Sequence, residues 1–256
     1  MSRKIEFNVG IIAVFILFPF YFLCQKTKKN TEGICLNFNH FVGDKLLILD
    51  DTTYTNELNQ TYIVSKFNYY IGQIHLMRED GKEYSISNHF LISEDDDKSA
   101  SKKIVLEKIP SGTYTSIRFI LGVDSLHNCS GAQSGALDPI NAMFWTWNTG
   151  YIFLKLEGKS TFSSAIGNTL EYHIGGYKIP NNSIRTISLP FENPIVIEKK
   201  RMTEINIKTD ISEILKTPTT IDFITTPTVN TLLNATMIAD NYSDIFTIID
   251  INSIKY

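Results

Sequence analysis

Apolar and polar residues alternate along most of the chain, and this alternation predicts short strands separated by turns. The first clear run places Ile34, Leu36, Phe38 and His40 on one face of a strand. Similar runs recur around residues 71–76, 114–121 and 151–156. A period of two is typical of strands that bury one face, as in antiparallel sheets.

Turn residues separate these runs. Asp80-Gly81 stands between two of them and is the sequence signal of a two-residue hairpin, and Pro110 and Gly112 precede another. Short strands at this spacing predict an all-β fold, an antiparallel β-sandwich of the immunoglobulin-like, Greek-key type. Because no internal repeat or linker interrupts the pattern, residues 34–256 are expected to form one domain.

Two parts of the chain depart from the strand pattern. Residues 122–150 have no sustained period but concentrate glycine, aspartate, proline and both tryptophans, Trp145 and Trp147. A loop of this length in a compact domain is usually functional or disordered, and its aromatic content argues against disorder. We therefore expect one long Trp-rich loop, and short helices at residues 211–216 and 232–240.

The N-terminal segment has the pattern of an export signal. Arg3 and Lys4 precede the apolar run from Phe7 to Cys24, and a polar stretch follows. Cys24 at the end of this run is the expected lipid-acceptor of a bacterial lipoprotein; an uncleaved membrane anchor is the alternative. Residues 1–24 are thus the predicted signal or anchor and residues 25–33 a tether, which places the protein in the cell envelope, in the periplasm or at the outer surface.

Composition and the absence of certain motifs narrow the classes of function that this protein can have. The 256 residues include 24 Lys and Arg against 27 Asp and Glu, so the basic excess that nucleic-acid binding needs is missing. The sequence has neither a nucleophile elbow nor a glycine-rich phosphate loop, and no carboxylate pair stands out for acid and base work. We therefore expect neither a nucleic-acid partner nor an enzyme.

If Cys24 carries lipid, Cys35 and Cys129 remain as an even pair. In an oxidising compartment two interpretations of this pair stand equally open: a predicted disulfide, or two small buried thiols. The candidate metal ligands are five histidines, and none of them has zinc-finger or His-x-x-x-His spacing. They are His40, His75, His89, His127 and His173.

Trp145 and Trp147 flank Thr146, and in an extended segment both indoles point to one face. Packing into the core is the plainest interpretation. Two more specific interpretations are an indole ring that lies beside a metal ion and an aromatic platform that binds a sugar.

The chain resembles the MbnP-like copper-binding protein family, in the version found as exported lipoproteins of Bacteroidetes-type bacteria. The most specific matches are the Trp-x-Trp-Asn-x-Gly-Tyr block that ends at Tyr151 and the His-Ile-Gly-Gly block that begins at His173. The other matching stretches are 36–43, 66–71, 109–114, 121–125, 135–139, 155–158 and 238–242.

This resemblance implies a β-sandwich that binds copper, as Cu(I) or Cu(II), through histidines assisted by a tryptophan that a partner haem enzyme oxidises to kynurenine. His40 and His173 fall on the family's recurrent positions, so they are the implied ligands, and Trp145 or Trp147 is the implied aromatic. Where many relatives carry a C-terminal His-x-His, this chain has Asp250 and Asn252. Oxygen ligands there would favour harder ions and weaken copper binding.

Two functions are therefore carried forward. The first is a membrane-tethered, extracytoplasmic protein that captures, stores or delivers copper. The second is a surface module without metal, which recognises a carbohydrate or a protein through Trp145, Trp147 and Tyr151.

Overall fold

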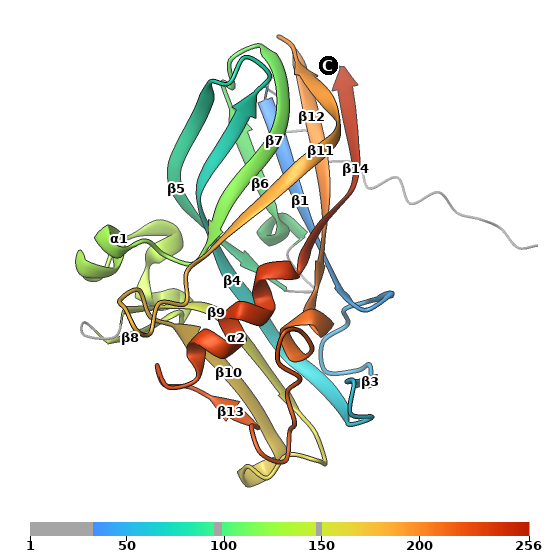
Figure 1. Cartoon of the computed structure of the whole chain (residues 1–256), viewed down its shortest axis with the longest axis vertical. Helices are drawn as coiled ribbons and strands as arrows, with labels where there is room; N and C mark the ends of the chain where they lie inside the picture. The colour runs from blue at the N-terminus through green and yellow to red at the C-terminus, as the bar shows by residue number, and fades with distance from the viewer. Residues whose placement is uncertain (1–32, 95–98, 147–149, 256) are drawn as a thin grey trace, which may run out of the picture.

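The computed structural model describes residues 33–94, 99–146 and 150–255, and two β-sheets make up most of this part of the chain (Figure 1). The first sheet has five strands. Its order is β14 (Phe246–Lys255), β12 (Arg201–Asp210), β1 (Gly33–Val42) and β2 (Lys45–Leu46), and β6 (Lys103–Glu107) also pairs with β1.

The second sheet has nine strands and is built around β4 (Thr61–Arg78), the longest of them. Its order is β11 (Arg185–Ile197), β7 (Gly112–Leu121), β4, β9 (Gly150–Lys159), β10 (Thr169–Gly175) and β13 (Thr228–Val229). Three further strands join it at the sides: β3 (Tyr54–Thr55) and β5 (Glu83–Ser93) pair with β4, and β8 (Phe144–Thr146) pairs with β9.

The core lies between the inner faces of the two sheets. On β1 the predicted alternation is confirmed, because Ile34, Leu36, Phe38 and His40 are all buried while the intervening Asn37 and Asn39 are half-buried. Phe38 makes edge-to-face ring contacts with aromatic side chains from three other strands: Tyr69, Phe119 and Phe246. Burying such a side chain contributes about 1.5–3 kcal/mol, so these contacts hold the two sheets together.

The prediction of an all-β sandwich is confirmed, but the sheets are not purely antiparallel. β1 runs parallel to β12, and β10 runs parallel to β13. Parallel strands cannot be joined by a tight hairpin, and here long stretches of chain separate the partners. The alternation of apolar and polar residues shows which face of a strand is buried. It does not show whether a partner strand that is distant in sequence runs parallel or antiparallel.

The hairpin predicted at Asp80-Gly81 joins β4 to β5, with a longer connection than expected. β4 ends at Arg78 and β5 begins at Glu83, and the Arg78 N–H donates to the Lys82 carbonyl over 2.8 Å. Gly81 has φ +78°, a conformation that glycine adopts without steric cost. The loop therefore has four residues instead of two.

Residues 122–146 are not the irregular loop that the sequence predicts. They contain a helix, α1 (Ser125–Cys129), the 3₁₀ turns η2 (Gly135–Leu137) and η3 (Pro139–Asn141), and strand β8. Buried hydrogen bonds fasten the segment to the large sheet: Tyr151 Oη donates to the Leu137 carbonyl and Tyr70 Oη to the Ala136 carbonyl. It is a folded cover over part of the sheet, with Trp147 outside the described residues.

The two predicted C-terminal helices are present as the 3₁₀ turn η5 (Ile211–Leu215) and the α-helix α2 (Ala235–Asn241). Three further short turns occur in the described chain, η1 (Ser99–Lys102), η4 (Ile166–Asn168) and η6 (Tyr242–Asp244). Within the described ranges, no helix has the length and apolar character needed to span a bilayer. Cys24 and the rest of the predicted signal lie outside those ranges.

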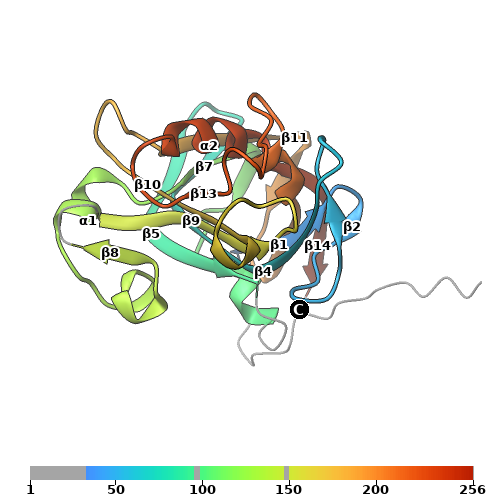
Figure 2. The same cartoon turned by 90° about the horizontal axis from the view of Figure 1, so that it is seen from below.

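The predicted disulfide between Cys35 and Cys129 does not form in the structure. Cys35 is buried on β1, where its thiol contacts Asn37 Oδ1 at 3.3 Å, whereas Cys129 is exposed on α1 and lies 3.5 Å from Tyr177 Oη. Viewed from below, α1 and β1 lie on different sides of the molecule (Figure 2). An even number of cysteines in the sequence does not show how far apart the two thiols lie in the fold.

Candidate functional site

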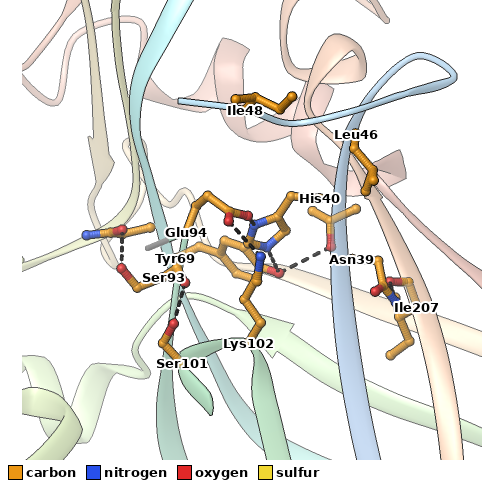
Figure 3. Close-up of polar contacts among 12 residues, drawn as sticks. Asn39, His40, Leu46, Ile48, Tyr69, Ser93, Glu94, Ser101, Lys102 and Ile207 are labelled. Atoms are coloured by element: carbon orange, nitrogen blue, oxygen red, sulfur yellow. Dashed lines mark hydrogen bonds and ion pairs between the residues drawn. The ribbon is translucent and has the colours of Figure 1, made fainter. Parts of the chain in front are cut away.

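His40, the first predicted ligand, lies in a buried polar pocket between the sheets (Figure 3). Its Nδ1 is 2.7 Å from Glu94 Oε2, and its Nε2 is 3.1 Å from Tyr69 Oη. The Tyr69 hydroxyl also contacts Thr209 Oγ1 on β12 at 3.2 Å. Both ring nitrogens of His40 therefore have protein partners, and these partners connect the two sheets.

The charged groups in this pocket are the Glu94 carboxylate and the Lys102 ammonium, which balance one another. Lys102 Nζ donates to Glu94 Oε1 over 2.6 Å. Burial lowers the pKa of His40, although Glu94 opposes that effect; for Glu94, burial alone would raise the pKa, but hydrogen bonds from His40 and Lys102 lower it. Near neutral pH His40 is thus a neutral imidazole beside a carboxylate, and a metal at Nε2 would have to displace the Tyr69 hydroxyl.

These shifts predict that the protein loses stability in acid in two stages. The pKa of His40 is lower in the folded protein than its ordinary 6.5, so the unfolded chain binds more protons and the free energy of unfolding falls as the pH drops below 6.5. Below 4.5, Glu94 adds a second loss by the same linkage, because its folded pKa is also depressed. Urea unfolding at a series of pH values measures both stages. The pKa of His89 is lowered as well, to about 4, so a His40→Ala protein should lose part of the first stage and His75→Ala should keep all of it. Equal profiles for all three proteins would contradict the assignment.

His173, the second predicted ligand, lies on β10 and points to the opposite face from its buried neighbours Tyr172 and Ile174. Its side chain is 13% exposed and stands between two carboxylates. Nε2 is 2.8 Å from Glu157 Oε1 and Nδ1 is 3.2 Å from Glu171 Oε1. Each ring nitrogen of His173 thus has its own carboxylate partner, at a place that solvent can reach.

Trp145 packs against the same strand. A Cβ at Gly175 would stand 2.9 Å from Cζ3 of the Trp145 ring, so the indole lies directly on the strand where a side chain is missing. Gly175 follows His173 by two residues, and the pairing of β10 with β9 shifts register between Ile174 and Gly175. The structure therefore places Trp145 against β10 two residues along the chain from His173.

His40 and His173 are not brought together. His40 faces the interior from β1 of the five-stranded sheet, while His173 faces outward from β10 of the nine-stranded sheet, and each has its own carboxylate partners. A shared metal ion bound by both remains a prediction from the resemblance, without a contact between them in the described chain.

Asp250 and Asn252, at the places where many relatives carry histidine, lie on β14 in the five-stranded sheet. Asp250 Oδ1 accepts from Asn206 Nδ2 over 2.6 Å and from Asn252 Nδ2 over 2.5 Å. The two residues therefore belong to a network of amide hydrogen bonds on that sheet and lie on a different sheet from His173.

The alternative of a surface platform fails at one of its three residues. Tyr151 is fully buried, and its hydroxyl donates inward to the Leu137 carbonyl over 2.8 Å. Trp145 is half-buried against the core, and Trp147 lies outside the described residues. Tyr151 therefore anchors the 122–146 segment and cannot stack against a ligand at the surface.

Sequence reasoning missed a third group, formed by His89 on β5 with Asp124 and His127 at α1. Among the described residues, these three are the set whose ligand atoms lie close enough together to hold a metal, all within 4.8 Å of one another. Burial is the main cause that lowers the pKa of His89 to about 4, and the nearby His127 adds to it, so its imidazole is neutral. The spacing from Asp124 to His127 fits a helix N-cap, but no pattern linked that pair to residue 89.

Comparisons with known proteins agree with the fold. A model of the MbnP family matches residues 31–234. The solved structure of MbnP from Methylosinus trichosporium superposes with a TM-score of 0.56 at 12% sequence identity, over 87% of this chain and 99% of that chain. A search of curated proteins finds no match. At this identity the structural likeness establishes the fold alone.

Proposed function

This chain belongs to the MbnP family, and we propose on that basis that it is an extracytoplasmic copper protein that captures, stores or delivers the metal. The proposal includes a tether to a membrane of the cell envelope through lipid on Cys24 or through the uncleaved N-terminal segment. The signal-like sequence supports export, and family membership supports a copper-related role.

The observation that carries the copper proposal is that Trp145 packs against β10 at Gly175, two residues from His173. The Trp block and the His-Ile-Gly-Gly block are separated by about twenty residues of sequence, and the fold places the indole on Gly175, two residues from His173. A tryptophan-assisted metal site requires an indole near a histidine, and the half-buried Trp145 meets that requirement. Glycine at 175 makes room for the ring and also for the Tyr151 carbonyl oxygen, which would lie 2.5 Å from a Cβ.

The donor set around His173 fits Cu(II) better than Cu(I). Two carboxylates, Glu157 and Glu171, flank the imidazole, and Cu(II) accepts mixed nitrogen and oxygen ligands while Cu(I) prefers soft sulfur or imidazole. In the proposed site His173 supplies the nitrogen ligand, Glu157 or Glu171 supplies oxygen, and Trp145 closes one side. If a partner haem enzyme oxidises Trp145, the kynurenine would add a further polar group at this position.

The test is the metal content and the intact mass of the protein isolated from membranes of its own host. We expect one copper ion per chain by elemental analysis. If Trp145 or Trp147 has become kynurenine, the mass increases by about 4 Da over the unmodified chain, and peptide mapping identifies the residue.

A chelator provides the matched measurement. Because a ligand that binds only the native state stabilises it by mass action, removing copper should lower the melting temperature, and adding copper back should restore it. A protein that contains no copper, takes up none on addition and melts identically with and without chelator would contradict the proposed function.

A further inference from the structure

His89 occupies a recess in β5 that its neighbours shape closely. Its side chain is 2% exposed, and a Cβ at Gly72 on β4 would stand 2.7 Å from His89 Nε2 and 2.5 Å from Cδ2. Only glycine leaves room for the imidazole there. The next residue, Gln73, has φ +48° and forms a bulge, a feature that re-aims side chains in sheets and is common beside functional sites.

The imidazole in this recess has no hydrogen-bond partner among the described residues at either ring nitrogen. A buried polar group without a partner destabilises the folded protein, so such groups call for an explanation. The nearest acceptor is Asp124, whose Oδ2 lies 3.3 Å from His89 Nε2 but outside hydrogen-bond geometry. This arrangement suits a nitrogen that has another partner when the protein functions.

α1 supplies the other two side chains. Asp124 caps the helix, with Oδ1 accepting from the His127 N–H over 3.1 Å, and its Oδ2 is 2.7 Å from His127 Nδ1. The rings of His89 and His127 have their centroids 4.5 Å apart. Because Asp124 fixes His127 through both backbone and side chain, the two imidazoles and the carboxylate converge without further rearrangement of the helix.

We propose that His89, Asp124 and His127 form a second metal site, which binds a divalent transition-metal ion such as Zn(II) or Cu(II). Two imidazoles and one carboxylate are a donor set for these ions, and three protein ligands leave a coordination position open. The open position faces solvent along His127, whose side chain is 31% exposed. The buried His89 is the inner ligand and His127 the outer one.

The distances fit this assignment. Metal–ligand bonds of about 2.0–2.1 Å at a tetrahedral angle put neighbouring ligand atoms roughly 3.3 Å apart. His89 Nε2 and Asp124 Oδ2 already have this separation, at 3.3 Å. The 2.7 Å contact between Asp124 and His127 is a hydrogen bond that a metal would replace, which requires a rotation of the partly exposed His127 ring.

This site is separate from the one proposed at His173. β5 pairs with β4, β4 with β9 and β9 with β10, so three strand spacings divide His89 from His173. At about 4.8 Å each, they amount to roughly 14 Å, which is too far for one ion to be shared. The second site therefore stands or falls independently of the proposed function.

The test titrates Zn(II) into the full chain carrying His173→Ala, so that only the second site is measured. In this background His127→Ala should weaken Zn(II) binding by about 100-fold, because loss of even an outer-shell partner costs 10–100-fold. The matched control is His75→Ala, which removes an exposed histidine paired with Glu83 and should leave the affinity unchanged. Calorimetry gives the affinity, and far-UV circular dichroism verifies the fold.

Cu(II) provides a spectroscopic readout that is independent of the Zn(II) affinity. The His173→Ala protein loaded with one equivalent of Cu(II) should show hyperfine splitting from two imidazole nitrogens in its electron paramagnetic resonance spectrum, and adding His127→Ala should reduce this to one. Undiminished Zn(II) affinity in the His127→Ala protein, an equal loss in His75→Ala, or a parent that takes up neither ion would each overturn the second site.

Discussion

Replacing His40 with alanine is expected to lower the free energy of unfolding by about 2–4 kcal/mol, because it leaves buried polar groups without a hydrogen-bond partner and opens a cavity in the core. The substitution removes the contacts of Nδ1 with Glu94 and of Nε2 with Tyr69 and leaves a cavity between the sheets. Glu94 keeps Lys102 as a partner, which holds the loss within this range. Urea unfolding at neutral pH in the presence of chelator measures the effect without any contribution from metal.

Two variants separate this effect from a general sensitivity of the sandwich. His75→Ala removes an exposed imidazole and should change the free energy of unfolding by no more than about 0.5 kcal/mol. Glu94→Gln keeps the shape of the pocket but loses its charge, and it should cost less than His40→Ala. A His40→Ala protein as stable as the parent would show that the buried network contributes nothing to holding the sheets together.

The fold was predictable from sequence where burial is decided locally. On β1, the alternation from Ile34 to His40 predicts which side chains face the core, and the structure buries all four of them, along with Cys35 between the first two. The partner of β1 was not predictable, because its parallel neighbour β12 lies more than 150 residues further along the chain. The helix and turns within residues 122–146 were missed for a related reason: they are held by hydrogen bonds to Tyr70 and Tyr151 on the sheet.

The candidate sites were likewise predictable from sequence only in part. Family resemblance singled out His173 with Trp145 or Trp147, but the contact of Trp145 with β10 at Gly175 is visible only in the fold. His89 and His127 are 38 residues apart and meet because α1 follows β7, which lies next to β4 beside β5. Spacing rules find ligands that share one element, whereas these come from separate elements.

Replacing His173 with alanine is expected to abolish stoichiometric copper at the β10 site, with the affinity falling by roughly 100-fold or more, because the imidazole is the one nitrogen ligand in that donor set. The side chain is partly exposed and outside the core, so the variant should fold with nearly unchanged stability. Copper titration followed by competition with a chelator of known affinity gives the ratio between parent and variant.

The His40→Ala variant tests whether His40 and His173 bind copper together, as the resemblance implies. If His173 and His40 do not share one copper ion, which fits their positions on different sheets, the His40→Ala protein keeps its copper affinity at the β10 site even though its fold is less stable. If the two histidines share an ion after a rearrangement, both variants lose copper equally, and the Tyr69 hydroxyl must leave His40 Nε2 on binding. Copper retained by the protein that carries both His173→Ala and His127→Ala would refute the β10 site, because the second site is removed in that background.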